Sequence, residues 1–592
     1  MSEKKRSAWT QLRRIWLTPV FFLGLATVVM FGVPFMVDWY FRPVSVESLN
    51  PLELVFNYDL ETLQNALGNL AQTVAAVVGI VMTVVAIVVQ LAATRYTPRI
   101  TELFLKERTN VVVLGFFVVS CIMAIYVSLA VGNGFLPKVS VVVAVLAVTL
   151  SLLLMVPYFV FVFDFLDPEG VVTRIRDGAI KIAGRAIKDP DGSQVAVLQA
   201  VEQLSDVAVA AMANHDKIIA SHAVDAMRTL AVRYLEGKHH LPLAWHSPNA
   251  EVLRNPDFVS MSPDSLEDLV REQTWLEWKL LRQFQAIYNG ALDSNPDMNY
   301  LIAIDTRYTG EAALKWGEVH VVALVIKFFN TYLRATLNKR QVRTAYNVMN
   351  QYRQLIEAIL RDPAHNRRVT EIAGYLRYYG QTANGMGLGF VTETIAYDIA
   401  TLCELAFQLK HPGHDDLLGA VLELDREAED EASERALRGV RKAQIRLAAY
   451  YLEHGAEEHA RRIHADMIAE RPERLLSLKT ELLRIVDKDF WEVIDRGANF
   501  DFMPPERKLQ LEVFFSWFSW TTRSIRPDTS VIKTPRTEVR RKIEREESDE
   551  HSALASSSGL VSEAVAGSQQ VEESSEQASL SASARFREED LS

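Results

Sequence analysis

The sequence predicts an all-α membrane protein with four transmembrane helices, a large α-helical cytoplasmic domain and a disordered C-terminal tail. Three observations support this fold class. Long uncharged apolar runs recur near the start of the chain, helical spacing of apolar residues dominates its middle, and strand patterns are sparse throughout. The last part of the chain is rich in Ser, Glu, Ala and Gln, a composition that cannot bury a hydrophobic core.

These changes in composition divide the chain into four parts. We expect a basic cytoplasmic N-terminus over residues 1–14, a four-helix transmembrane domain over 15–163, an α-helical cytoplasmic domain over 164–525, and a disordered acidic Ser-rich tail over 526–592. The 592 residues are 49% hydrophobic and 23% charged, which fits a membrane part joined to a soluble part. The net charge of −11 argues against a nucleic-acid partner, and two cysteines cannot form a disulfide framework.

Four apolar runs are long enough to cross a membrane, because a span needs ~20 apolar residues. The first covers residues 15–37, and we interpret it as a retained span because it is longer than a signal-peptide core. The second lies between Glu61 and Arg95, where no residue is charged, and the third and fourth cover 111–131 and 139–163.

Basic residues fall on the same side of the membrane at each crossing. The loop over residues 38–61 is mostly acidic, whereas the next loop and the segment after the fourth span are basic. The basic residues are Arg95, Arg99, Lys106, Arg108, Arg174, Arg176, Lys181, Arg185 and Lys188. The positive-inside rule therefore predicts a multi-pass protein with both termini in the cytoplasm.

The second span carries its few polar and small residues on one face. Asn65, Gln72, Gly79, Thr83 and Gln90 are spaced so that, at ~100° per residue, they form a narrow stripe. An amide that faced lipid would lose its hydrogen bonds, so we expect the stripe to face protein or water. Two alternatives remain open, a packing seam between helices and the lining of an aqueous path in an oligomer.

A basic turn follows this span. Thr97 can cap a short helix and Pro98 suits its first position, while Arg95 and Arg99 are expected at the level of the lipid headgroups. Ordinary positive-inside anchoring explains both arginines, and a lipid-phosphate or anion site is the alternative.

The second span, the turn and the start of the third span resemble a family. Thr97-Pro98-Arg99 and the run from Leu114 to Phe116 are similar to the signature of the bacterial predicted membrane proteins called domain of unknown function 2254. A weaker similarity covers residues 195–235, where Asp216, Ala220 and Asp225 match a second family element. The resemblance implies a bacterial inner (plasma) membrane location; it implies no reaction.

The segment after the fourth span predicts helices almost throughout. We expect helices over residues 194–235, 265–289, 310–337, 341–361, 417–454, 457–470 and 475–486. Residues 238–263 read as a loop, and breaks are predicted at 362–363, 380–389 and 411–416.

Four groups of residues in this domain are candidate sites of chemistry. The loop from His411 to Asp416 has metal-ligand residue types, but its Pro, Gly and Asp also suit a turn. His215, His222 and Asp225 share a helix face, which fits either an ion site or a salt-bridged structural helix. The spacing of His454, His459 and His464 by five residues does not keep them on one face, and the Gly-rich run over 384–389 lacks the strand and the lysine of a P-loop.

The sequence therefore predicts no catalytic residue, no cofactor and no metal site, and we do not expect an enzyme. Its expected partners are the lipid bilayer, further copies of the same chain and cytoplasmic proteins. Two functions are compatible with these patterns. One is an oligomeric channel-like or transport assembly lined by the second span, and the alternative is a membrane-anchored scaffold or sensor that recruits partners through the helical domain.

Overall fold

The structure is a computed structural model, and part of the chain lies outside its description. It describes residues 18–40, 60–95, 101, 104–131, 137–424, 431–489, 492, 496–497 and 499–518. These residues form helices joined by turns, and they contain no strand. The predicted basic N-terminus and the predicted tail over 526–592 lie outside the described residues.

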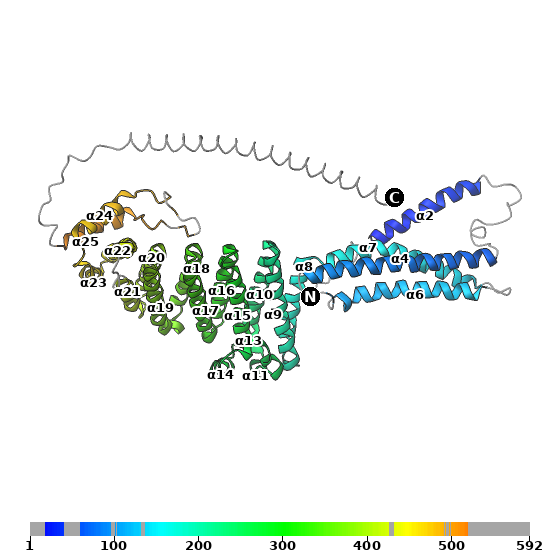
Figure 1. Ribbon diagram of the computed structural model, residues 1–592, viewed down its shortest axis with the longest axis horizontal. Helices are drawn as coiled ribbons and strands as arrows, with labels where there is room; N and C mark the ends of the chain where they lie inside the picture. The colour runs from blue at the N-terminus through cyan, green and yellow to red at the C-terminus, as the bar shows by residue number, and fades with distance from the viewer. Residues whose placement is uncertain are drawn as a thin grey trace, which may run out of the picture. The chain divides into compact units, whose positions relative to one another are not determined.

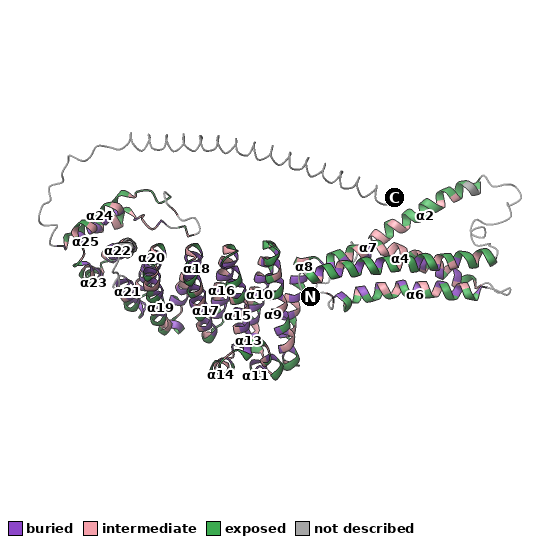
Figure 2. Cartoon of the chain, in the orientation of Figure 1, coloured by how far each residue is buried: buried purple, intermediate pink, exposed green. Residues whose placement is uncertain are grey.

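The four predicted spans are helices. They are α2 (Thr18–Tyr40), α4 (Leu60–Arg95), α6 (Arg108–Ala130) and α7 (Lys138–Phe165). Helix formation satisfies every backbone group internally, which an apolar run in a membrane requires. Helices α4, α6 and α7 pack on one another, and α2 contacts α7 (Figure 1). Much of the outer surface of these helices is exposed (Figure 2). The exposed residues include many large apolar ones, as expected for surfaces that meet lipid.

A fifth helix, α9 (Pro190–Ala213), is also long and apolar enough to span a membrane. Half of its most apolar window is buried inside the structure, against 28% or less in the other four helices. It packs against α8 (Pro168–Ala183), α10 (Lys217–Gly237) and α15 (Trp275–Ala291). Its apolar residues are therefore used for packing within the helical domain.

From α9 to α22 the long helices form two rows (Figure 1). One row contains α9, α15, α17 (Val319–Asn338), α19 (Asn366–Gly385) and α21 (His414–Leu422). The other contains α10, α16 (Pro296–Lys315), α18 (Val342–Leu360), α20 (Gly389–Gln408) and α22 (Glu431–Glu453). Each helix contacts its hairpin partner and its neighbours in the row. This arrangement is an α-solenoid, in which stacked helix pairs share one elongated core.

Shorter helices flank the array, which is the two rows of helices from α9 to α22. Between α10 and α15 lie η3 (Lys238–His240), α11 (Leu243–His246), α12 (Ala250–Leu253), α13 (Pro256–Val259) and α14 (Pro263–Arg271). Helix η4 (Pro363–His365) separates α18 from α19. Helices α23 (Glu457–Met467), α24 (Pro472–Arg484) and α25 (Pro505–Ser516) pack against α22. The predicted loop over residues 238–263 was wrong, because Asn249 and Asn255 cap two four-residue helices there and Ser262 caps the nine-residue α14.

One turn geometry recurs seven times between helices of the described chain. Its middle residue has a positive φ between 50° and 72°. The next residue then donates its N–H to the carbonyl oxygen five positions earlier, at 2.8–3.1 Å, as in a Schellman motif. The seven middle residues are His215, Gln273, Gly317, Arg340, Gly387, Lys410 and Gly455. Such a short turn reverses the chain at once, which brings consecutive helices side by side.

These turns explain where predicted boundaries were wrong. The patterns over residues 265–289 and 310–337 were each predicted as one helix, but a three-residue turn divides each of them. The predicted break at 380–389 starts too early, because α19 continues through Gly380 to Gly385. Gly380 is a packing residue: a Cβ atom there would lie 2.3 Å from Leu424 Cδ2.

Candidate functional site

The packing face of α4 is apolar and looks toward α6 and α7. Seven residues of α4 form this buried face: Leu67, Ala71, Val74, Val81, Val85, Val89 and Ala92. Ala71 and Val74 share a cluster with Ala124 of α6 and Val148 of α7. At ~100° per residue the seven side chains span about 80° around the helix axis.

The predicted polar stripe lies on a different face of α4. Asn65, Gln72, Gly79, Thr83 and Gln90 are all exposed. Their centre lies about 140° around the axis from the centre of the packing face. The chain's own bundle therefore does not cover the stripe, so the stripe is not a seam between helices of one chain. A seam between copies and an aqueous lining remain as alternatives.

The stripe contains side-chain amides that have no hydrogen-bond partner among the described residues. The Thr83 hydroxyl donates to the Gly79 carbonyl oxygen at 2.9 Å, so this polar group is satisfied within the helix. Among the described residues, Gln72 and Gln90 have no hydrogen-bond partner. A Cβ atom at Gly79 would meet no atom within 4 Å, so packing inside one chain does not explain this glycine. Both observations therefore point to contacts outside the single chain, with another copy or with water.

The basic turn after α4 is only partly visible. Arg95 is the last residue of α4, and its side chain and the whole of Arg99 lie outside the described residues.

Arg174 of α8 contacts the C-terminal end of α7. Its guanidinium lies 4.2 Å from the Phe165 ring centroid and donates to the Phe165 carbonyl oxygen. Burial lowers the pKa of Arg174, and the nearby Asp164 carboxylate opposes that shift. Arg174 therefore anchors the helix end through its own chain.

A buried polar pair inside the bundle was missed by the sequence analysis. The Tyr158 hydroxyl of α7 donates to Asn110 Oδ1 of α6 at 2.7 Å. The Asn110 amide in turn donates to the Phe104 carbonyl oxygen at 3.2 Å. The available signal was one asparagine at the start of an apolar run. The pair fixes α6 against α7, because buried polar groups keep partners.

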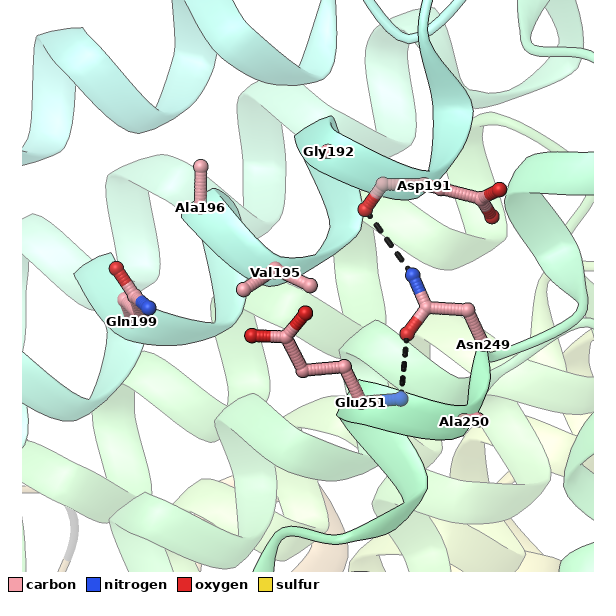
Figure 3. A pocket seen from close by; sticks show the side chains of 8 residues that line it. All are labelled: Asp191, Gly192, Val195, Ala196, Gln199, Asn249, Ala250 and Glu251. Carbon is pink, nitrogen blue, oxygen red and sulfur yellow. Dashed lines mark hydrogen bonds between the residues drawn. The ribbon is translucent and has the colours of Figure 1, made fainter.

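A shallow surface pocket of about 450 Å³ lies between the start of α9 and α12 (Figure 3). The Asn249 amide donates to the Asp191 carbonyl oxygen at 3.0 Å, and Asn249 Oδ1 accepts from the Glu251 N–H at 3.0 Å. Asn249 is therefore occupied in fixing the two helix starts. The remaining polar groups are the Asp191 and Glu251 carboxylates and the Gln199 amide, which do not form a nucleophile and base pair.

Buried lysines in the array are paired as well. Lys238 Nζ lies 2.6 Å from Glu277 Oε1 and 2.8 Å from Glu318 Oε2. Burial acts to lower the pKa of Lys238, but the Glu277 and Glu318 carboxylates outweigh it and the pKa is raised. Lys279 Nζ is held by Asp257 at 2.6 Å and Asn255 at 3.0 Å. Both amines are held by hydrogen bonds and ion pairs to side chains of the same domain, so they have a structural role.

The other predicted candidates are mostly structural. His215 occupies one of the seven turns, and Asp225 pairs with Arg228 on α10. His222 Nε2 lies 3.8 Å from Glu169 Oε1. The salt-bridged interpretation of this helix therefore fits the contacts better than an ion site. The glycine-rich run over residues 384–389 ends α19, forms a turn and begins α20, so it connects two helices.

Comparison with known proteins gives one match. Residues 13–197 match the sequence model of a family described as "Predicted membrane protein (DUF2254)". This part of the chain, which is less than half of it, is similar to the DUF2254 family. No curated protein and no solved structure matches the chain.

The extent of the DUF2254 match has a structural meaning. It includes the four spans and α8, and it ends within α9. The resemblance predicted from the second span and its turn is confirmed. The weaker similarity over residues 195–235 lies almost entirely beyond the DUF2254 match, as does the array from α10 onward.

Proposed function

We propose that this protein forms a homo-oligomer in which the polar faces of α4 from several copies surround a channel-like path. One observation supports the proposal above the others: the stripe from Asn65 to Gln90 is exposed on the far side of α4 from the bundle. Transferring an amide to hydrocarbon without a hydrogen bond costs roughly 2–7 kcal/mol. Placing Gln72 and Gln90 toward a shared interior removes that cost.

The orientation of the assembly follows from charge. The loop between α2 and α4 is acidic, and the residues around Arg95 and Arg108 are basic. Under the positive-inside rule the helical domain lies in the cytoplasm, and for a bacterial protein the membrane is the inner (plasma) membrane. In the cytoplasm, the array can bind cytoplasmic partners or act on the channel-like path between the α4 helices.

Recording from the purified full chain in planar bilayers tests the channel proposal. We expect ion conductance that Gln90→Leu alters. The variant Gln90→Leu/Leu91→Gln keeps the composition of α4 but moves the amide by ~100° around the axis, so it should behave like the single variant. Absence of conductance, or equal conductance in all three proteins, would exclude this function.

The second candidate is a membrane-anchored scaffold, and the α-solenoid favours it. Such arrays present long continuous surfaces, which many repeat proteins use to bind other proteins. Affinity capture with the full chain and with a chain lacking residues 164–592 tests whether the array recruits other proteins. A scaffold retains specific proteins only when the array is present, whereas recovery of the same proteins by both chains contradicts a scaffold role.

A further inference from the structure

Three potential metal ligands meet at the end of the array. His414 begins α21 and is buried, Asp415 follows it, and His459 lies on α23. The ligand atoms of these three residues all lie within 4.8 Å of one another. From the sequence, His414 and Asp415 belonged to a loop with metal-ligand residue types for which a turn was the alternative, and His459 was dismissed because of its spacing from His454 and His464.

The hydrogen bonds leave one imidazole nitrogen of each histidine without a strong partner. His414 Nε2 lies 2.6 Å from the Tyr451 hydroxyl oxygen, and His414 Nδ1 lies 3.7 Å from Asp415 Oδ1, beyond hydrogen-bond range. His459 Nδ1 is buried and has no hydrogen-bond partner in the described part of the chain. The two rings are close, with centroids 4.7 Å apart. Buried polar atoms normally have a partner, so the unpaired His459 Nδ1 needs an explanation.

We propose that His414, Asp415 and His459 bind a divalent transition-metal ion of the zinc type. Two imidazoles and one carboxylate form a ligand set that suits such ions, with water in the remaining position. Tyr451 serves as the outer partner that fixes the orientation of the His414 ring. The ion would join α21 to α23, and so connect the array to the helices that close it.

The surroundings of the three ligands fit this role. Phe407 of α20 packs against both imidazoles, with ring centroids 5.8 Å from His414 and 5.9 Å from His459. The Tyr451 ring lies 5.2 Å from that of His459. An aromatic shell limits water access on one side of a metal site and holds the ligands in place.

Arg462 competes for the carboxylate. Its Nη1 atom lies 2.5 Å from Asp415 Oδ1. Bonds from zinc to nitrogen and oxygen ligands measure ~2.0–2.2 Å, so the ligand atoms must move closer together than they are here. The Asp415 side chain is 67% exposed and that of Arg462 is 41% exposed, so these two can rearrange while His414 stays fixed. When the metal ion binds, it therefore replaces the Arg462 guanidinium as the partner of the Asp415 carboxylate.

Titration of the full chain in detergent tests the site, with an affinity tag that contains no histidine and after removal of metals by a chelator. We expect one Zn²⁺ per chain by calorimetry and a visible absorption spectrum of tetrahedral type with Co²⁺. His459→Gln and His414→Gln should each weaken Zn²⁺ binding at least about tenfold. Arg462→Gln should tighten it about tenfold, because the competing cation is gone.

His464→Gln is the matched control, since it changes a histidine on the same helix outside the ligand set. It should leave Zn²⁺ affinity unchanged. Melting temperatures without metal show whether each variant is folded. The proposal is overturned if no saturable Zn²⁺ or Co²⁺ binding occurs, or if folded His459→Gln and Asp415→Asn proteins bind as tightly as the original chain.

Discussion

The Tyr158 hydroxyl lies 2.7 Å from Asn110 Oδ1 and joins α7 to α6 within the apolar bundle. Both side chains are buried, and the two residues are 48 positions apart in the chain. Hydrogen bonds between membrane helices contribute on average ~0.6 kcal/mol and up to ~1.7 kcal/mol. The contact is thus a specific link that fixes the register of two spans whose other contacts are interchangeable apolar ones.

Tyr158→Phe should reduce the stability of the bundle by about 1 kcal/mol, because Asn110 Oδ1 loses its donor. Thermal unfolding of the detergent-solubilised chain measures this. In the double variant Asn110→Leu/Tyr158→Phe no polar atom is left unsatisfied, so its loss should be less than the sum of the single losses. Fully additive losses would show that the two side chains are not coupled.

Gly317→Ala should destabilise the array by about 1 kcal/mol. Gly317 has φ of +72°, where a Cβ atom is unfavourable, and no atom lies within 4 Å of that Cβ position. The loss is therefore a backbone effect without steric overlap. Gly374→Ala within α19 is the control of opposite sign, because its surroundings are also open and alanine favours a helix. Chemical denaturation compares the two, and equal shifts would contradict the turn assignment.

Arg496→Met should cost roughly 2–4 kcal/mol, since it removes one partner of a buried ion pair. Arg496 Nη1 lies 2.6 Å from Asp398 Oδ1, and both side chains are at most 3% exposed. Burial raises the pKa of Asp398, and Arg496 and Arg353 oppose that shift. Hydrogen exchange should show faster opening of residues 499–518. Adding Asp398→Asn should recover part of the stability, and no recovery would argue against the pair.

Stability should fall as the pH is lowered from about 7.5 to 5.5, partly because of His246. Burial lowers the pKa of His246 from 6.5 to about 4, helped by Lys238 and opposed by Glu318. In this range the unfolded chain takes up a proton at this residue and the folded chain does not. The loss from His246 is on the order of 1 kcal/mol. Melting curves of His246→Asn should show a smaller pH dependence, and an unchanged dependence would exclude this residue as a source.

Disulfide crosslinking tests whether α4 helices meet between copies. In a Cys121→Ala/Cys403→Ala background, Gln72→Cys should form dimers in oxidised membranes, since the stripe is expected to face another copy. Val84→Cys is the control, because it is exposed about 120° around the axis from the stripe. Crosslinking at Val84 alone would place a different face of α4 in the interface.

The sequence allowed the membrane helices and the polar face of α4 to be predicted, because both depend on residue type and helical period. It did not reveal the two-row array. Four of its seven tight turns have His215, Gln273, Arg340 or Lys410 at the positive-φ position, where glycine would have marked the turn. A three-residue turn also leaves the apolar period almost unbroken. The sequence could not assign His414 and His459 to one site, because only packing of α21 against α22 and α23 brings them together.

The uniformity of the array has a mechanical consequence. Helices α16 to α20 are 19 or 20 residues long, and each packs against its hairpin partner and the helices beside it. In such a stack, small rotations between successive helix pairs add up along its length and set the curvature of the whole array. A change in the curvature of the array is therefore divided among many steps and needs no single hinge.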